Sequence, residues 1–268
     1  MTAIAVTIAG SDSGGGAGIQ ADLKAFSANG VYGASVLTAL TAQNTLGVTA
    51  IHDVPPDFVR AQMDAVYSDL AVTATKIGML SRVDTIEAVA AGLKAHDTGP
   101  IVLDPVMVAA SGDPLLADSA VDTLMSALLP LADIITPNLH EAARMLQCSV
   151  AAGEAEMHAQ AERLLGLGAK AVLLKGGHGD SAESTDLYLD ADGNALWLRD
   201  TRIATNNTHG TGCTLSSTIA ASLAKGQTLQ QAVQAAKTYI QAAISAADRL
   251  EIGQGHGPVH HFHAFWSE

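Results

Sequence analysis

The chain has 268 residues, of which 48% are hydrophobic and only 15% are charged. This composition is too apolar for a disordered chain, and it predicts one α/β domain over residues 1–268. A net charge of −13, with no run of five or six like charges and no basic face, argues against nucleic acid and anionic membranes as partners.

Two further features of the sequence bear on location. The N-terminal segment has no basic stretch followed by a long apolar one, and no later segment approaches 18 uninterrupted apolar residues. The two cysteines, Cys148 and Cys213, are far apart and form no CxxC pair, so neither a disulfide framework nor a cysteine zinc site is indicated. We therefore expect a cytoplasmic protein without a membrane partner.

Short apolar runs alternate with segments of helical periodicity along the whole chain. The predicted strands are Ile4–Ala9, Val31–Leu40, Thr75–Met79, Ile101–Asp104, Asp133–Thr136 and Ala171–Lys175. The predicted helices are Gly18–Asn29, Pro55–Leu70, Val83–Ala95, Ala117–Leu129, Leu139–Leu146, Glu154–Leu167, Gly212–Ala224 and Leu229–Ala247. Strands separated by helices of this length indicate βαβ units, so we expect a three-layer α/β/α fold around a mainly parallel sheet.

Two segments near the C-terminal end add detail to this fold. Leu187–Leu189 and Leu196–Arg199 flank a polar turn, and they predict a hairpin that adds antiparallel strands at one edge of the sheet. The apolar face of the last helix, which includes Val233, Ile240 and Ile244, is interpreted as a surface that packs on the sheet and not as part of a binding site.

The loops that follow the parallel strands are the candidate site, because ligands of open parallel sheets bind beyond the carboxyl ends of the strands. The strands concerned end at Ala9, Met79, Asp104, Thr136 and Lys175. The motifs GxxxxGK[ST], GxGxxG, HExxH and GxSxG are all absent, which argues against P-loop nucleotidases, common dehydrogenases, zinc proteases and serine hydrolases.

The segment Asn206–Thr214 combines glycines with a cysteine at the start of a predicted helix. The backbone N–H groups of Gly210, Thr211 and Gly212 can converge on one point, where the helix dipole adds positive potential, and this predicts an anion hole for a phosphoryl group in transfer. Cys213 falls in the first helical turn, a position expected to lower a thiol pKa so that the thiolate can accept a proton. The alternative is a small buried side chain without a chemical role.

Three polar side chains follow later strands. The oxygen atoms of Asn138 and Glu141, one helical turn apart, suit Mg²⁺ bound directly or through water. An equally good local account makes Asn138 the N-cap of the helix and Glu141 its partner in a capping box. Lys175 can present its ammonium to a phosphate, or it can be a solvated lysine before a turn.

The remaining candidates have weaker signals. The amide of Gln43 can pair with a ring nitrogen and the adjacent amino group of an aminopyrimidine, as it does with adenine, although a plain polar loop residue is the simpler account. The glycine-rich segment Gly10–Gly18 is either a phosphate loop or a flexible turn, and Asp22 after it can be a partner of the helix dipole. The histidines near the C-terminal end are interpreted as a surface feature and not as a metal site; they are His256, His260, His261 and His263.

Seven segments occur in the order found in the ribokinase superfamily, and they specifically resemble the hydroxymethylpyrimidine/phosphomethylpyrimidine kinases of thiamine biosynthesis. They are Ala9–Asp22, Leu40–Val48, Lys76–Leu80, Asp104–Met107, Thr136–Ala142, Lys175–His178 and His209–Thr214. The resemblance runs from Ile4 to about Trp266. The wider superfamily uses the aspartate of a GxGD segment as the catalytic base, and Cys213 stands in that place here, as in some pyridoxal kinases.

The resemblance implies a role for each motif. The implied catalytic residues are Cys213 as the base, with Gly210, Thr211 and Gly212 as the anion hole. The implied substrate-binding residues are Gln43 against the pyrimidine, Met79 and Val106 in the ring pocket, and Asp22 near the hydroxymethyl group. The residues implied for ATP and its phosphates are Lys175, Asn138 and Lys237, and those implied for magnesium are Glu141 and Asn138.

The resemblance also implies a reaction. ATP would phosphorylate the hydroxymethyl group of 4-amino-5-hydroxymethyl-2-methylpyrimidine and then the resulting monophosphate, with Mg²⁺ as the cofactor and a homodimer as the assembly. Two alternatives stay open. One is a pyridoxal kinase that uses the same fold and base, and the other is a non-catalytic sensor of a nucleotide or pyrimidine, which the retained base, magnesium motif and lysine argue against.

Overall fold

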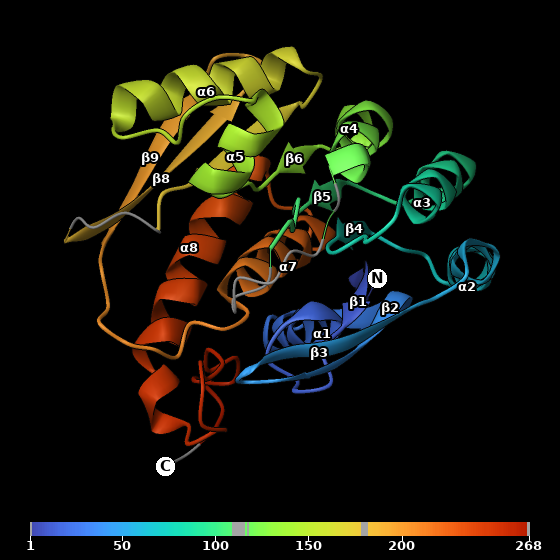
Figure 1. Ribbon diagram of the computed structural model, residues 1–268, viewed down its shortest axis with the longest axis horizontal. Coiled ribbons are helices and arrows are strands. Elements are labelled where there is room, and N and C mark those ends of the chain that lie inside the picture. The colour runs from blue at the N-terminus through green and yellow to red at the C-terminus, as the bar shows by residue number, and fades with distance from the viewer. Residues whose placement is uncertain (1, 109–115, 117, 178–181, 267–268) are drawn as a thin grey trace.

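The computed structural model describes residues 2–108, 116, 118–177 and 182–266, and its described strands form one sheet (Figure 1). The strands are β1 (Ile4–Ser11), β2 (Tyr32–Asn44), β3 (Gly47–Asp53), β4 (Ala74–Ile77), β5 (Ile101–Leu103), β6 (Ile134–Ile135), β7 (Ala171–Lys175), β8 (Glu183–Asp190) and β9 (Ala195–Thr201). The helices are α1 (Gly18–Ala28), α2 (Pro56–Asp69), α3 (Val83–Ala95), α4 (Asp118–Ala127), α5 (Leu139–Leu146), α6 (Glu154–Gly166), α7 (Thr211–Ala224) and α8 (Leu229–Ser245). Ala117, the first residue of one predicted helix, and His178, the last residue of one motif, lie outside the described residues.

The sheet has a parallel centre and antiparallel edges. Its strand order is β3-β2-β1-β4-β5-β6-β7-β8-β9, and the pairs from β2 to β7 are all parallel. The predicted hairpin is present as β8 and β9, which are antiparallel to each other and to β7. The other edge strand, β3, was not predicted, because its residues are largely exposed and lack the apolar run of a buried strand.

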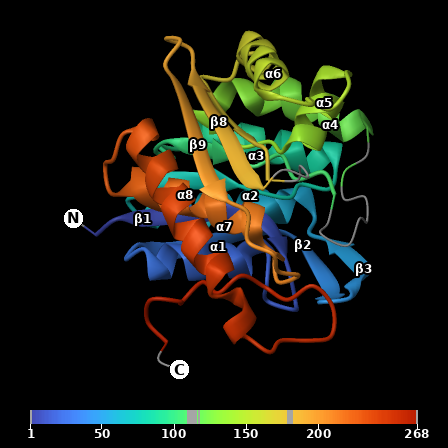
Figure 2. The same ribbon diagram turned by 90° about the vertical axis from the view of Figure 1, so that its left-hand side faces the viewer.

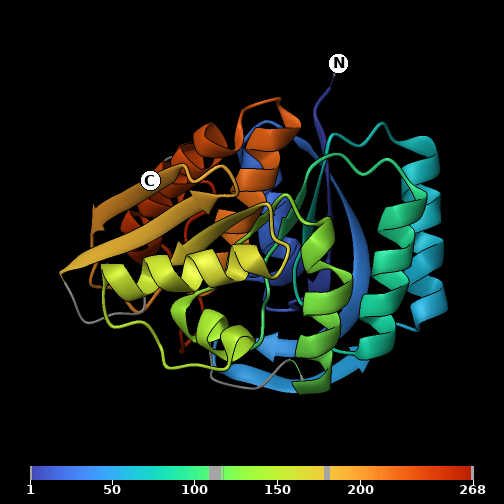
Figure 3. The same ribbon diagram turned by 90° about the horizontal axis from the view of Figure 1, so that it is seen from above.

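Helices cover both faces of the sheet, which confirms the predicted α/β/α fold (Figure 3). Helices α2 to α6 pack on one face around a core that includes Ile8, Ile77 and Leu103. Helices α1, α7 and α8 pack on the other face around Phe26 and Ile219. Because all six interior residues of β1 are buried, this strand reads as a continuous apolar run, as expected for a central parallel strand.

Local sequence signals set the ends of several helices. Pro56 occupies the first turn of α2, where its missing N–H costs nothing. At the start of α8, Thr228 accepts a hydrogen bond from the Gln231 N–H while the Gln231 side chain accepts one from the Thr228 N–H, which completes a capping box. Within the described ranges, no helix is both long enough and apolar enough to cross a membrane.

One prediction about α8 is wrong in part. Val233 packs against the sheet as expected, but Ile240 and Ile244 border the large cavity of the molecule. The apolar face of α8 therefore packs on the sheet with some of its residues and borders the cavity with others. Beyond this helix the chain turns back, and the N–H of His256 donates to the carbonyl of Thr45 in the β2–β3 turn (Figure 2).

The junction after β7 has no room for a side chain, which makes a stability prediction possible. A Cβ atom on Gly176 would lie 2.1 Å from the carbonyl oxygen of Thr185 on the paired strand β8. We expect Gly176→Ala to lower the free energy of unfolding by about 1–3 kcal/mol, because neither backbone can move away without breaking strand pairing. Gly166→Ala is the matched control, since a Cβ at Gly166 would meet nothing within 4 Å. Equal denaturant midpoints for the two variants would contradict this account.

Candidate active site

A cavity of ≈ 500 Å³ lies at the carboxyl ends of the parallel strands. All five loops that the sequence singled out contribute to its wall, through residues that include Ser11, Met79, Asp104, Asn138 and Gly177. The start of α7 and one side of α8 complete it. The cavity therefore lies where ligands of open parallel sheets bind.

The start of α7 is packed tightly against the glycine-rich loop that follows β1. Gly210 precedes the helix with φ of +80°, and a Cβ on it would lie 1.9 Å from the carbonyl oxygen of Gly16. Only glycine fits this conformation and this contact. The N–H groups of the following residues, Thr211 and Gly212, are in the first turn of the helix and border the cavity. The three residues predicted to form an anion hole, Gly210, Thr211 and Gly212, therefore all border the cavity.

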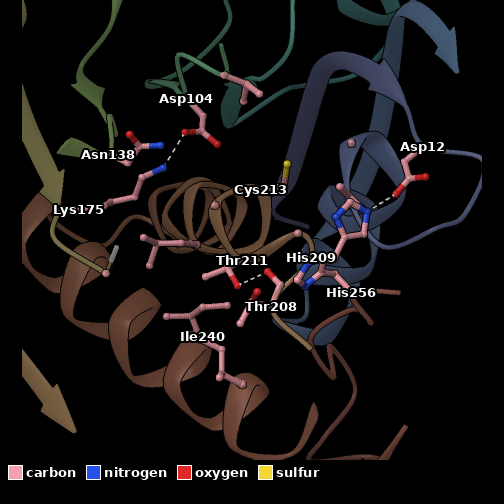
Figure 4. A pocket seen from close by; sticks show the side chains of 18 of the residues that line it. Asp12, Asp104, Asn138, Lys175, Thr208, His209, Thr211, Cys213, Ile240 and His256 are labelled. Atoms are coloured by element: carbon pink, nitrogen blue, oxygen red, sulfur yellow. Dashed lines mark hydrogen bonds and ion pairs between the residues drawn. The ribbon is translucent and has the colours of Figure 1, made fainter. Parts of the chain in front are cut away.

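A buried contact holds the same loop in place (Figure 4). Asp12 lies 2.8 Å from Nε2 of His209 and accepts hydrogen bonds from the N–H groups of Gly14, Gly16 and Ala17. Burial raises the pKa of Asp12, but these hydrogen bonds outweigh it and leave the pKa below its usual value. Neither Asp12 nor His209 was among the predicted site residues, although both lie in motifs that the sequence indicates.

The thiol of Cys213 borders the cavity in the first turn of α7 (Figure 4). The expectation of a lowered pKa is wrong for this structure. Surrounding protein raises the pKa of Cys213 to about 11, while the ammonium of Lys76 acts in the opposite direction. The positive potential at the start of the helix lowers the pKa less than burial of the sulfur raises it. The thiol is therefore neutral near pH 7 in the absence of substrate.

Lys175 is not the solvated lysine that the simpler interpretation allowed. Its ammonium lies 3.1 Å from Oδ1 of Asp104, and a Cβ on Gly212 would lie 3.3 Å from it. Burial lowers the pKa of Lys175, but the nearby carboxylates of Asp104 and Glu141 outweigh this and raise it. The lysine is thus charged and lies close to the first turn of α7, an arrangement that suits a phosphate.

Asn138 and Glu141 form the capping box that was the alternative to a magnesium site. Oδ1 of Asn138 accepts from the Glu141 N–H at 2.9 Å, and Oε2 of Glu141 accepts from the Asn138 N–H at 2.7 Å. Burial raises the pKa of Glu141 to about 7. Both residues border the cavity, so their oxygens suit Mg²⁺ held through water while the cap stays intact.

The residues assigned to the pyrimidine divide into two groups. Gln43, Met79 and Val106 border the cavity, and Oε1 of Gln43 accepts a hydrogen bond from the Thr41 hydroxyl. Asp22 is not among the residues that border it. The fully buried carboxylate of Asp22 is paired with Lys76, which does border the cavity, so Asp22 lies directly behind the cavity wall.

Lys237 borders the cavity from α8, close to Ile240. Its ammonium lies 2.8 Å from Oδ2 of Asp186 and 3.2 Å from the carbonyl oxygen of Ser184. A phosphate at this end of the cavity would therefore share the lysine with Asp186.

The histidines near the C-terminal end do not act together. His256 borders the cavity, whereas Nε2 of His261 pairs with the Thr214 hydroxyl at 2.9 Å and His263 packs against the ring of Tyr239. Across the described part of the chain, no group of three or more His, Cys, Asp or Glu side chains is arranged to hold a metal ion.

Comparison with known proteins gives a consistent result. The family model described as phosphomethylpyrimidine kinase matches residues 12–260. A hydroxymethylpyrimidine/phosphomethylpyrimidine kinase of Rhizobium meliloti is 63% identical over 268 residues, which is 100% of both chains. The protein of the same name from Salmonella typhimurium is 53% identical over 98% of both chains.

Solved structures with the same fold include enzymes with two different names. A phosphomethylpyrimidine kinase from Clostridium difficile has a TM-score of 0.79 and 43% identity, covering 90% of this chain and 99% of its own. A Bacillus subtilis pyridoxal kinase in complex with ADP has a TM-score of 0.89 and 37% identity, covering 97% and 98%. The family model spans more than nine-tenths of the chain, in agreement with the motifs, and the chain belongs to the phosphomethylpyrimidine kinase family.

Proposed function

We propose that this chain transfers the γ-phosphoryl group of ATP first to the hydroxymethyl group of 4-amino-5-hydroxymethyl-2-methylpyrimidine and then to the resulting monophosphate, as a pyrimidine kinase of thiamine biosynthesis. One observation carries the proposal. A single cavity is bordered by the thiol of Cys213, the N–H groups at the start of α7, the ammonium of Lys175 and the side chain of Gln43. Its size suits a small ring and the phosphates of a nucleotide.

The chemistry of the first step needs a base. The hydroxymethyl oxygen attacks the γ-phosphorus, the bond from that phosphorus to the β-phosphate oxygen breaks, and the thiolate form of Cys213 accepts the proton of the alcohol and becomes the neutral thiol. The N–H groups of Thr211 and Gly212, with Lys175 beside them, stabilise the negative charge of the phosphoryl group in transfer. In the second step the nucleophile is a phosphate oxygen that is already anionic near neutral pH, so no proton has to leave.

Magnesium would be held through water by Glu141 and Asn138, and it would neutralise part of the charge of the ATP phosphates. Lys237, which shares its ammonium with Asp186, would contact the nucleotide at the α8 side of the cavity. Lys175 would contact the transferred phosphate.

An ADP-release assay tests the proposed function. The purified chain is given ATP, Mg²⁺ and, in separate reactions, the hydroxymethylpyrimidine, its monophosphate and pyridoxal. Pyridoxal is included because solved structures of similar fold are named pyridoxal kinases. We expect the highest kcat/KM with the two pyrimidines. A higher value with pyridoxal would reject the assignment, and melting shifts without ADP release would support a sensor.

Replacement of the base should separate the two steps. Cys213→Ala is expected to slow the first phosphorylation by about 10²–10⁴-fold, the usual contribution of a general base. The second step should change much less, since its nucleophile needs no base. Cys148→Ala is the matched control, because Cys148 is a free cysteine outside the cavity. Equal losses in both steps would mean that Cys213 shapes the anion hole and does not take the proton.

The protonation of Glu141 should control the response to magnesium. Its pKa of about 7 lies above the usual glutamate value, so the carboxylate forms only as the pH rises through 7. Metal binding requires the ionised form. We expect the Mg²⁺ concentration for half-maximal activity to fall by roughly tenfold between pH 6 and pH 8, in line with the ionised fraction. Glu141→Gln should abolish this dependence, and an unchanged profile in that variant would exclude Glu141 as the cause.

The assembly and the location are also part of the proposal. A homodimer agrees with the exposed apolar side chains of the β2–β3 hairpin, Leu40, Leu46 and Ile51, which a second copy could cover. Light scattering should give twice the chain mass, and Leu46→Glu should reduce it to the mass of one chain.

The two free cysteines agree with a cytoplasmic location.

A further inference from the structure

A buried lysine beneath the cavity has no part in the chemistry described so far. Lys76 is the third residue of β4, its side chain is inaccessible to solvent, and it lies at the wall of the cavity that contains Cys213. Its ammonium donates to both carboxylate oxygens of Asp22, at 2.9 and 3.0 Å. An ammonium has three N–H donors, so Asp22 leaves at least one of them unused.

The chain makes specific room for this ammonium. A Cβ atom on Gly78, two residues further along, would lie 2.6 Å from Nζ of Lys76 and 3.0 Å from the Cβ of Ala9. Residues two apart in an extended segment share a face, so the glycine opens the space into which the lysine folds. A charged group kept in such a confined place is costly unless its charge is used or neutralised.

The partner of Lys76 is tied to the helix that carries the thiol. The hydroxyl of Ser217 donates to Oδ1 of Asp22 at 2.6 Å, and the hydroxyl of Thr7 donates to Oδ2 at 2.6 Å. Ser217 is four residues after Cys213 in α7, and residues at this spacing share one face of a helix. The face of α7 that carries Cys213 therefore lies over the Lys76–Asp22 pair.

Four charged groups act on the thiol from the elements packed around it. They are Asp22 from α1, Lys76 from β4, Asp104 after β5 and Lys175 at the end of β7. Burial raises the pKa of Cys213, the ammonium of Lys76 is the largest influence that lowers it, and the two carboxylates raise it. Lys175 pairs with Asp104 and Lys76 pairs with Asp22, and of the two ammonium groups that of Lys76 has the larger effect on the thiol.

We propose that Lys76 is a positioning residue whose buried ammonium, held in place by Asp22, stabilises the thiolate form of Cys213, which is the form that can accept the proton of the pyrimidine alcohol. This inference rests on the proposed role of Cys213 as the base. In this role Lys76 acts through the sulfur of Cys213.

The test measures the thiol itself, apart from catalysis. In a Cys148→Ser background, the rate of alkylation of Cys213 by iodoacetamide is followed against pH for the parent, Lys76→Met and Lys76→Met/Asp22→Asn. Lys76→Met alone leaves a buried carboxylate without its partner and is expected to lose thermal stability. The double variant removes both charges and keeps the site neutral, so it carries the test if the single variant does not fold.

We expect alkylation at a fixed pH to fall by about tenfold or more in Lys76→Met, because an opposite charge close to a buried group shifts its pKa by about one unit or more. A smaller fall in the same direction is expected in the double variant, since the carboxylate that opposed the lysine is also gone. Lys237→Met is the matched control. Its ammonium is bonded to Asp186 and not to Asp22, and its loss should leave the pH dependence of alkylation unchanged.

The two phosphorylations provide the second readout. The first step should slow in the folded lysine variants in proportion to the lost thiolate, and the second step should stay within about threefold of the parent, because it needs no base. An alkylation profile that is unchanged in the folded double variant would overturn the inference. If the profile shifts while Cys213→Ala slows both steps equally, the lysine still stabilises the thiolate and the base role of Cys213 fails.

Discussion

Two buried ion pairs, Lys76–Asp22 and Lys175–Asp104, govern the electrostatics beneath the cavity. In each pair the lysine comes from a parallel strand and the carboxylate from a different segment of the chain, so the pairs form only when the strands are in their correct order. Breaking one pair would leave an uncompensated charge in the interior, which costs far more than a surface pair contributes. The register of the sheet and the charge of the site are therefore set by the same contacts.

This arrangement explains how an acidic chain can accept a polyanion. The net charge of −13 gives no general attraction for nucleotides, so the positive potential must be local. It arises where Lys175 approaches Gly212 at the start of α7, because the ammonium and the helix N–H groups act on the same small volume. The contact of Asp12 with His209 holds the glycine-rich loop against Gly210. This contact fixes the position of the loop relative to the start of α7.

The sequence predicted the parallel centre of the sheet and the loops of the site because both depend on local patterns. The helices α3 and α5 have the predicted bounds, and five predicted loops meet at the cavity. Strand β3 was missed because an exposed edge strand has no apolar run. The lowered pKa expected for Cys213 was wrong because helix position is local, whereas burial depends on segments distant in sequence. Lys76 stood in a quoted motif, yet nothing near it in sequence shows that its partner is Asp22.

The high thiol pKa has a consequence for an enzyme that performs two phosphorylations in one cavity. A permanently charged thiolate beside the anion hole would repel the phosphate that the second step must bind, since like charges in a partly buried site repel strongly. A thiol with a pKa of about 11 is neutral when the monophosphate enters, and only its minor thiolate form accepts the alcohol proton in the first step, which returns it to the neutral thiol. Burial of Cys213, which weakens it as a resting base, therefore makes the same site compatible with both substrates.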